Sequence, residues 1–162
     1  MSNASRDNGI AVAEPDSAGF VSGLECRIGK ARIAVPTEAI ARIVEYRTLP
    51  LPLAKPWIGG IGLHEGTPLV SVALRHAKDG ARGATPAKGI LLNVPTSPIG
   101  WVLEVEEVFV FVRAKVVDRT EIGNRKLPRW IGIAMTDEGR SLGWVNVAAM
   151  LADLAQVAPE AA

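Results

Sequence analysis

The sequence predicts an all-β protein with short helices, built as two similar lobes. Residues 57–75 contain two apolar, partly alternating runs around His-Glu-Gly-Thr-Pro, which is the pattern of a β-hairpin with half-buried strands. Much the same pattern returns at residues 130–145, with one residue fewer after the tryptophan. A spacing of roughly 73 residues is too long for a solenoid unit and long enough for a small β-subdomain. We therefore expect two related lobes in one compact domain.

The composition bounds the class of protein. A chain of 162 residues has the usual size of one domain, with room for two lobes around one extended core. The net charge of +1 lacks the basic surplus that phosphate neutralisation requires, so we expect no nucleic-acid partner. No apolar run reaches about 18 residues, which argues against membrane insertion. The N-terminus lacks the pattern of a signal peptide, and we expect a cytoplasmic protein.

The chain is predicted to begin with a disordered arm and a first hairpin. Residues 1–17 are small and polar and cannot offset the entropy of ordering. A strand from Phe20 to Ile28, a Gly-Lys turn and a return strand over 31–35 follow. Cys26 lies in this hairpin and has no cationic cluster nearby in sequence, so we expect a buried structural thiol.

A short helix is predicted after Pro36, followed by extended chain. Ala39, Ile40 and Ile43 recur at helical spacing, and Glu38 and Arg42 would lie one turn apart on its polar face. Residues 43–49 read as extended, and three prolines between 50 and 56 exclude regular structure before the central hairpin.

The second half is predicted to repeat this organisation. After a polar loop at 76–89, hairpin strands at 90–94 and 99–103 open the second lobe. A helical or turn segment at 104–108 with Val105 facing inward, a strand at 109–117 and a polar loop at 118–127 come next. A final helix begins at Asn146, a good N-cap, and presents an apolar face of Val147, Met150, Leu151 and Leu154.

These elements predict one domain over 18–157 and a frayed tail at 158–162. The lobes are expected at about 30–88 and 89–145, with the terminal segments crossing over.

No pattern for catalysis, cofactor or metal binding is apparent. Cys26 is the single cysteine, no Gly-x-Ser-x-Gly elbow occurs, and His64 and His76 lie in or beside predicted turns. The glycines at 59–62 fall within a strand pattern and precede no helix, unlike a phosphate-binding loop. We therefore expect a protein that is not an enzyme and holds no cofactor or metal.

The order of these motifs resembles the CheW family of chemotaxis coupling proteins. The resemblance covers residues 18–155 and rests on the first hairpin, on Ala34-Val35-Pro36 with Ile40 and Ile43, on the 60–75 hairpin, and on the ending Val145-Asn146-Val147. It implies two five-stranded SH3-like β-barrels around a shared hydrophobic core. It also implies a non-enzymatic adaptor that joins chemoreceptor tips to the regulatory domain of a CheA-type histidine kinase, recruited to membrane-associated receptor arrays.

Two departures from the family pattern set the expected partner site. Glu65 stands where the family usually has a hairpin arginine, and Arg42 stands where it tends to have glutamate. We expect these two side chains to form the same ion pair with its charges exchanged, in a groove between the lobes that holds a receptor-tip helix. The predicted partner-binding residues are Ile40, Arg42, Ile43, Leu63, Glu65, Gly66 and Val105.

Two other functions stay open at this point. The chain could be a CheW-like barrel of another assembly that has lost receptor or kinase coupling. A small-ligand-binding β-barrel is the other alternative, since barrels of this size can enclose a ligand.

Overall fold

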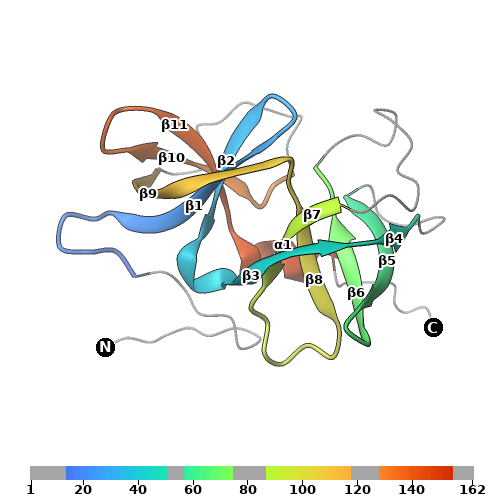
Figure 1. Cartoon of the computed structure of the whole chain (residues 1–162). Coiled ribbons are helices and arrows are strands. Elements are labelled where there is room, and N and C mark those ends of the chain that lie inside the picture. The colour runs from blue at the N-terminus through green and yellow to red at the C-terminus, as the bar shows by residue number, and fades with distance from the viewer. Residues whose placement is uncertain (1–13, 51–56, 75–86, 118–127, 155–162) are drawn as a thin grey trace.

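The computed structural model describes residues 14–50, 57–74, 87–117 and 128–154 (Figure 1). These residues are mostly β-strand, as predicted, with one α-helix and one turn of 3-10 helix over Thr37–Ala39. The strands are β1 (Val21–Ile28), β2 (Ala31–Pro36), β3 (Ile40–Tyr46), β4 (Thr48–Leu49), β5 (Ile58–His64), β6 (Thr67–Val72), β7 (Ala87–Leu92), β8 (Gly100–Glu104), β9 (Glu107–Val117), β10 (Ile131–Thr136) and β11 (Ser141–Val145), and the helix is α1 (Val147–Leu154).

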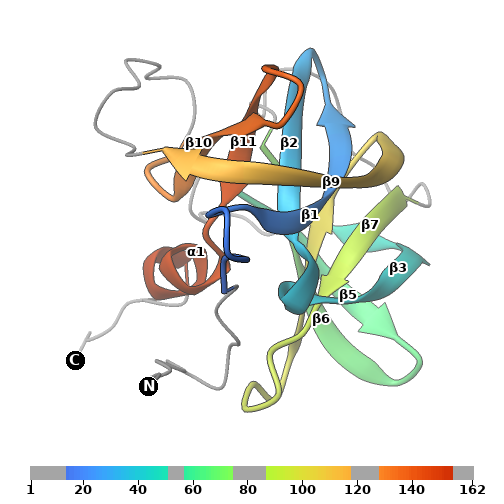
Figure 2. The same cartoon turned by 90° about the vertical axis from the view of Figure 1, so that its left-hand side faces the viewer.

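The strands form a closed barrel and a second, six-stranded sheet. The barrel has the order β1-β2-β11-β10-β9, and β9 pairs with both β10 and β1. The second sheet has the order β3-β7-β8-β6-β5-β4. Figure 2 shows the barrel strands above the strands of the second sheet. The all-β fold with two lobes is therefore confirmed.

The two sheets follow the same plan. In each, the second strand of a hairpin pairs in parallel with the last strand of another hairpin: β2 with β11 in the barrel, and β8 with β6 in the second sheet. The preceding strand of each first hairpin then pairs antiparallel with a longer strand, β9 in one case and β3 in the other. The repeated hairpins even share a closing bond, since the carbonyls of Trp57 and Trp130 accept from Ala73 and Asn146, each at 2.9 Å.

Each sheet combines strands from both halves of the chain. The hairpin β1–β2 joins β9, β10 and β11, whereas β7–β8 joins β3 to β6. The predicted lobe ranges of about 30–88 and 89–145 are therefore wrong for one strand and one hairpin: β2 belongs to the barrel, and residues 87–104 belong to the second sheet. Strands β2 and β8 each join their sheet through a parallel pair. Strands paired in parallel need a long crossover connection, so the partners come from distant parts of the chain.

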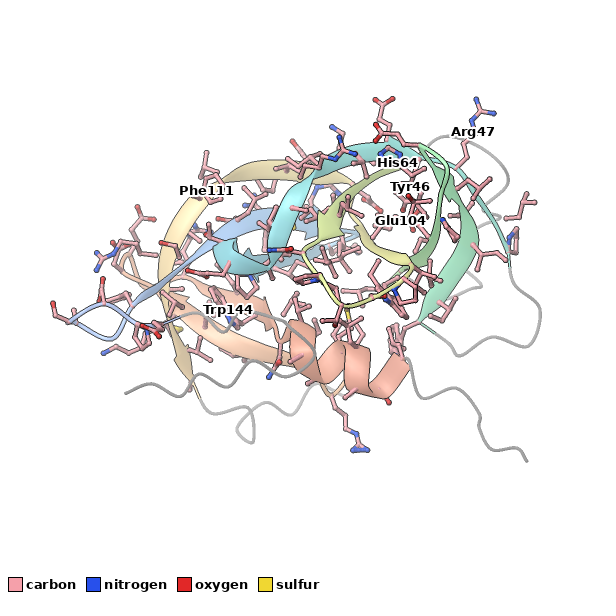
Figure 3. The ribbon with its side chains drawn as sticks, turned by 90° about the horizontal axis from the view of Figure 1, so that it is seen from below. Tyr46, Arg47, His64, Glu104, Phe111 and Trp144 are labelled. Atoms are coloured by element: carbon pink, nitrogen blue, oxygen red, sulfur yellow. The ribbon has the colours of Figure 1, made fainter. Side chains whose placement is uncertain are left out.

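A shared hydrophobic core joins the barrel, the second sheet and α1. Its buried side chains include Val35 from β2, Leu103 from β8, Trp130 before β10 and Met150 from α1. Two smaller hydrophobic clusters lie apart from this core. One is in the barrel and includes Trp144, and the other is in the second sheet and includes Tyr46 (Figure 3). The helix prediction is confirmed: Asn146 Oδ1 accepts from the Ala149 N–H at 3.0 Å, and the four predicted apolar residues are buried.

The helix predicted after Pro36 is wrong beyond one turn. Ile40 has extended dihedrals (φ −100°, ψ 124°), and β3 runs antiparallel to β7. The register shifts between Ile40 and Arg42, so a bulge at this point replaces strict alternation with a spacing that resembles a helix face. The segment at 104–108 also contains no helix. Strand β8 ends at Glu104 and strand β9 begins at Glu107.

The N-terminal arm is shorter than predicted. Asp16 Oδ1 accepts from the backbone N–H groups of Ala18 and Phe20, and its carboxylate pairs with Arg113 on β9. The Arg113 guanidinium also lies 4.8 Å from the centre of the Phe20 ring. These contacts fix Asp16 on the barrel. Residues 1–13, the tail at 158–162, the loop at 118–127 and most of the loop at 76–89 fall outside the described ranges.

A buried carboxylate ties the barrel together at one point. Glu25 on β1 is 2% exposed and accepts from Arg140 at 3.0 and 3.1 Å, and from Arg32 on β2. The hydrogen bonds from Arg140, more than those from Arg32, lower the pKa of Glu25 against the opposing effect of burial. Glu25 therefore stays ionised and links the first hairpin to the β10–β11 turn.

Replacing Glu25 tests this link. Glu25→Gln should lower the unfolding free energy at pH 7 by about 2 kcal/mol, because it removes charge-assisted hydrogen bonds inside the barrel. Since the folded pKa is depressed, the contribution is present above the ordinary carboxylate pKa of about 4.3 and is lost as pH falls through the folded value. Urea unfolding of both proteins between pH 7 and pH 3 measures the difference.

The matched control is Glu107→Gln, which removes a half-exposed partner of Arg27 and should cost under about 1 kcal/mol. A difference between wild type and Glu25→Gln that stayed constant down to pH 3 would contradict this role of the carboxylate.

Gly62 allows β4 to lie close to β5. A Cβ at this position would collide with the carbonyl oxygen of Arg47, directly before β4. Gly132 on β10 of the barrel is a strand glycine with room to spare, since a Cβ there would meet nothing nearer than the Trp144 oxygen at 3.9 Å. In the second sheet, Gly62 is therefore needed for the close packing of β4 against β5.

Gly62→Ala should therefore lower the unfolding free energy by about 1 to 3 kcal/mol through this overlap. Gly132→Ala, the same change at a strand glycine of β10 that has room for a Cβ, should leave stability unchanged or raise it by up to about 1 kcal/mol. Thermal and denaturant unfolding of the two variants decides the matter, and equal stabilities would show that the close approach of β4 is unimportant.

Candidate partner-binding site

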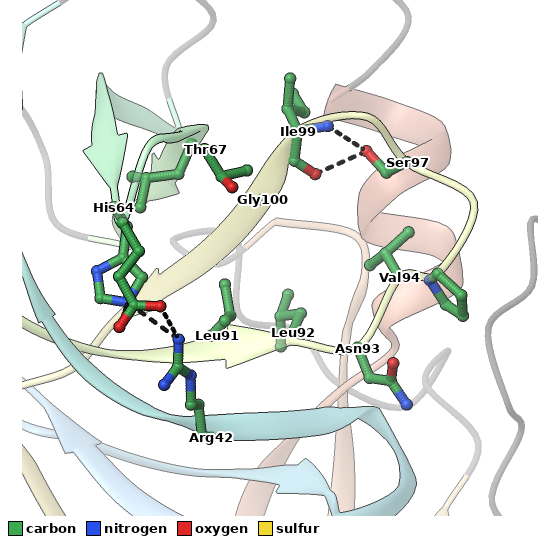
Figure 4. A pocket seen from close by; sticks show the side chains of 13 residues that line it. Arg42, His64, Thr67, Leu91, Leu92, Asn93, Val94, Ser97, Ile99 and Gly100 are labelled. Atoms are coloured by element: carbon green, nitrogen blue, oxygen red, sulfur yellow. Dashed lines mark hydrogen bonds and ion pairs between the residues drawn. The ribbon is translucent and has the colours of Figure 1, made fainter.

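An ion pair joins β3 to the tip of the β5–β6 hairpin. Arg42 Nη2 donates to Glu65 Oε1 at 2.9 Å and lies 3.3 Å from His64 Nε2 (Figure 4). Since arginine can only donate, this second contact is a hydrogen bond in the His64 tautomer whose Nε2 accepts. The predicted pairing of Arg42 with Glu65 is thus confirmed, and His64 is a third member that the sequence did not reveal. We call these three side chains the bridge.

Local backbone geometry places each member of the bridge. Val44 and Tyr46 point into the second sheet, and Arg42 lies two residues earlier on the same alternation, at the end of the sheet. At the hairpin tip, Glu65 and Gly66 both have positive φ (53° and 83°), and His64 pairs with Thr67. This is the two-residue turn that matches strand twist, and it holds Glu65 at the tip.

The bridge crosses a seam in the second sheet. In the barrel, the equivalent strands β9 and β10 pair through their backbones. Among the described residues, no backbone pairing joins β3 to β5, and β4 lies on β5 instead. The side chains of the bridge therefore connect two strand ends that the sheet leaves apart.

The charges of the bridge are accessible. The side chains of Arg42 and Glu65 are 52% and 65% exposed, and the hydrogen bond and charge of Arg42 lower the pKa of Glu65. Glu65 is therefore ionised at neutral pH. An exposed pair of this kind contributes only about 0 to 1 kcal/mol to folding. Its charges are available to an approaching partner.

A pocket of about 330 Å³ opens beside the bridge (Figure 4). Its apolar residues come from β6, β7 and the β7–β8 loop, and its polar residues gather at the bridge and on that loop. The lining residues are Arg42, His64, Glu65, Thr67, Leu69, Leu91, Leu92, Asn93, Val94, Pro95, Ser97, Ile99 and Gly100.

The remaining predicted site residues do not all gather here. Gly66 lies in the hairpin turn beside Glu65. Leu63 is 67% exposed and Ile43 is 47% exposed, but each neighbours a bridge residue in its strand and so points to the opposite face. Ile40 is partly buried against the shared core.

Val105, which was predicted to contact a partner, is buried in the structure. It is buried in the shared core, and its N–H donates to the carbonyl of Lys88. A side chain packed there can support the site but cannot contact a partner.

The pocket is not evident from the sequence, because its walls come from strands that the repeat pattern places in different lobes. Leu69 on β6 lies beside Gly100 on β8 through the parallel pairing of these strands. The repeat pattern places Leu91 and Ile99 in the other lobe. Their apolar character was visible in the sequence, but nothing local indicated that they would face His64.

Two patches of exposed apolar side chains lie outside the pocket. One contains Leu49 and Ile61, which pair across β4 and β5, together with Leu63. The other contains Val110 and Phe111 on β9, where the register with β1 shifts (Figure 3). Exposed apolar patches on a folded domain are typical of protein interaction surfaces.

Cys26 is the one cysteine of the chain, and it lies in the interior of the fold. Burial raises the pKa of the Cys26 thiol to about 12, and its side chain is fully buried, which confirms the structural cysteine. Within the described ranges, no group of three or more His, Cys, Asp or Glu side chains is arranged to hold a metal ion. The described helices include none of the length and apolarity needed to cross a membrane.

Comparisons with known proteins identify the family. The profile of the CheW-like domain matches residues 22–155. Among solved structures, the chain is similar to the scaffolding protein TtCheW from Thermoanaerobacter tengcongensis, with a TM-score of 0.58 and 15% identity over 78% of this chain and 88% of that one. No curated protein matches the chain significantly. Since the profile covers most of the chain, including both sheets and α1, the chain belongs to the CheW-like domain family.

Proposed function

We propose that the protein is a non-enzymatic adaptor that couples chemoreceptors to a CheA-type histidine kinase in chemotaxis or motility signalling. Membership of the CheW-like family supports the general role of a chemotaxis scaffold. The observation that carries the proposal further is the exposed bridge of Arg42 and Glu65 beside a pocket. The protein would work in the cytoplasm and be recruited to membrane-associated receptor arrays.

Coupling of this kind requires two separate surfaces. The receptor tip is a helix that would dock at the bridge, where exposed charges select among partners. The regulatory domain of the kinase would dock elsewhere, through apolar surface at a sheet edge such as Leu49 and Ile61. Binding at two distinct surfaces lets one molecule hold both partners at once.

The exchanged charges favour a second candidate, a CheW-like module that serves another assembly. Arg42 and Glu65 keep the ion pair but reverse the order of charges expected from the family, which would change the accepted partner without changing the fold. Such a module would have lost coupling to a chemoreceptor tip or to a CheA-type kinase.

Binding assays with purified partners separate these candidates. The full chain would be titrated with the cytoplasmic fragment of each chemoreceptor and with the regulatory domain of each CheA-type kinase encoded in the same genome, by calorimetry. We expect at least one receptor and one kinase domain to bind, and to bind together. Absence of binding to every receptor, or to every kinase domain, would contradict the proposal and support the second candidate.

Reversing one charge of the bridge should affect binding more than folding. Arg42→Glu places two carboxylates at the seam, and we expect receptor affinity to fall at least tenfold while the unfolding free energy falls by under about 1 kcal/mol. Arg129→Glu, the same charge change at an exposed residue before β10, is the control. An equal loss of affinity in the control would show that only net charge matters.

The double change Arg42→Glu with Glu65→Arg should restore the pair in the opposite sense. We expect its stability to return to that of the wild type, while its preference among receptor fragments changes. Measuring both single variants and the double variant against the same fragments gives the coupling energy. A double variant with the specificity of the wild type would contradict a selective role for the two charges.

A further inference from the structure

We infer that His64 is a proton-sensitive switch within the bridge. The neutral ring helps to hold Arg42, whereas the protonated ring repels Arg42, competes with it for Glu65 and leaves the bridge with a net positive charge. The switch itself follows from the geometry of the three side chains. Its consequence for coupling rests on the proposed function, because it makes the acceptance of a receptor depend on pH.

The Nε2 atom of His64 lies between two partners of opposite charge (Figure 4). It is 3.3 Å from Arg42 Nη2 and 3.7 Å from Glu65 Oε2. An unprotonated ring nitrogen can accept a hydrogen bond from arginine, whereas a protonated one can only donate. The same nitrogen therefore has its partner on β3 in one protonation state and its partner at the hairpin tip in the other.

Protonation of the ring turns its contact with Arg42 from attraction into repulsion. An imidazolium would bring a second positive charge to within 3.3 Å of the guanidinium, which cannot lose its own proton. The favourable contact that remains for the charged ring is the Glu65 carboxylate. Arg42 then loses one of its two acceptors and shares the other, so its guanidinium is held less firmly and becomes available to a partner.

The charges that face His64 all belong to the bridge. The lining of the pocket brings together β6, β7 and the β7–β8 loop, and its only charged or titratable side chains among the described residues are Arg42, His64 and Glu65. Arg47, between β3 and β4, is exposed and forms no hydrogen bond or ion pair with His64. No other titrating group in this part of the structure therefore competes with the ring.

Glu65 remains a carboxylate while the ring titrates. The hydrogen bond from Arg42, followed by the charges of Arg42 and His64, holds the pKa of the Glu65 carboxyl below its ordinary value. Histidine is the side chain whose charge changes between about pH 5 and 8. In that range, the acceptor for a protonated ring is already charged and in place.

The barrel has the same hairpin position without a titratable group. Thr136 ends β10 as His64 ends β5. The Thr136 hydroxyl accepts from the backbone N–H groups of Glu138 and Arg140, so it closes its own turn and keeps one charge state. The His64 side chain is 20% exposed and contacts another strand instead, which gives its ring access to solvent protons. Closing a hairpin does not require such a ring.

NMR of the free protein tests the switch without any partner. The chain contains two histidines, so a spectrum of His76→Gln assigns the ring nitrogens of His64. At pH 8 we expect the ring proton on Nδ1 and an unprotonated Nε2, and at pH 5 we expect protons on both nitrogens. The guanidinium signals of Arg42 and the carboxylate carbon of Glu65 should shift with the same midpoint. A proton on Nε2 at pH 8, or Arg42 signals that do not follow the ring, would overturn the switch.

Receptor binding at two pH values tests the consequence for coupling. The protonated bridge carries one more positive charge and a freer guanidinium, so it favours an acidic surface, and receptor-fragment affinity should rise at least about threefold between pH 7.5 and pH 5.5. His64→Gln is the matched variant, because its side-chain oxygen can accept from Arg42 but gains no charge. Its affinity should change by less than about 1.5-fold over the same range.

The outcomes separate the switch from the adaptor function. Failure of every receptor fragment to bind, together with the expected NMR transitions, would overturn the adaptor function and leave the switch standing. An equal response to pH in the wild type and His64→Gln, or weaker binding by the wild type at pH 5.5, would overturn the regulatory role of His64.

Discussion

The parallel pairing of β2 with β11 and of β8 with β6 is the constraint on which the rest of the structure depends. Each pairing joins strands from opposite halves of the chain, so neither half can complete its sheet alone. The apolar faces of these strands are buried together in one core, to which Trp130 and α1 also contribute. Two repeats that might have formed separate barrels are thereby committed to a single domain.

The candidate site follows from a difference between the two lobes in the way their strands close. The barrel closes through β9 and β10, but the second sheet leaves a seam between β3 and β5, and the approach of β4 at Gly62 takes the place of that pairing. Polar side chains can occupy the seam because water reaches them there. Arg42 and Glu65 do so at little energetic consequence for folding, which leaves their charges free to set specificity.

Local patterns in the sequence predicted local structure well. Alternating apolar residues were sufficient for the hairpins, and Asn146 with its helical apolar spacing was sufficient for α1. The pairing of Arg42 with Glu65 followed from the family resemblance and not from spacing. Hydrophobic patterns do not encode which hairpin pairs with which strand, so the lobe assignment was wrong and the pocket stayed hidden. The bulge after Ile40 misled the helix prediction, because it replaced the alternation of a strand with a spacing of three.

Native-state hydrogen exchange would test most directly whether the exchanged halves form one cooperative unit. The slowest amides of β2 in the barrel and of β8 in the second sheet should open with the same free energy, equal to that of global unfolding. Met150→Ala, a fully buried change in the shared core, should lower both values by the same amount, about 2 to 5 kcal/mol. Opening of one sheet at a lower free energy than the other, or a response to Met150→Ala in one sheet alone, would contradict the account.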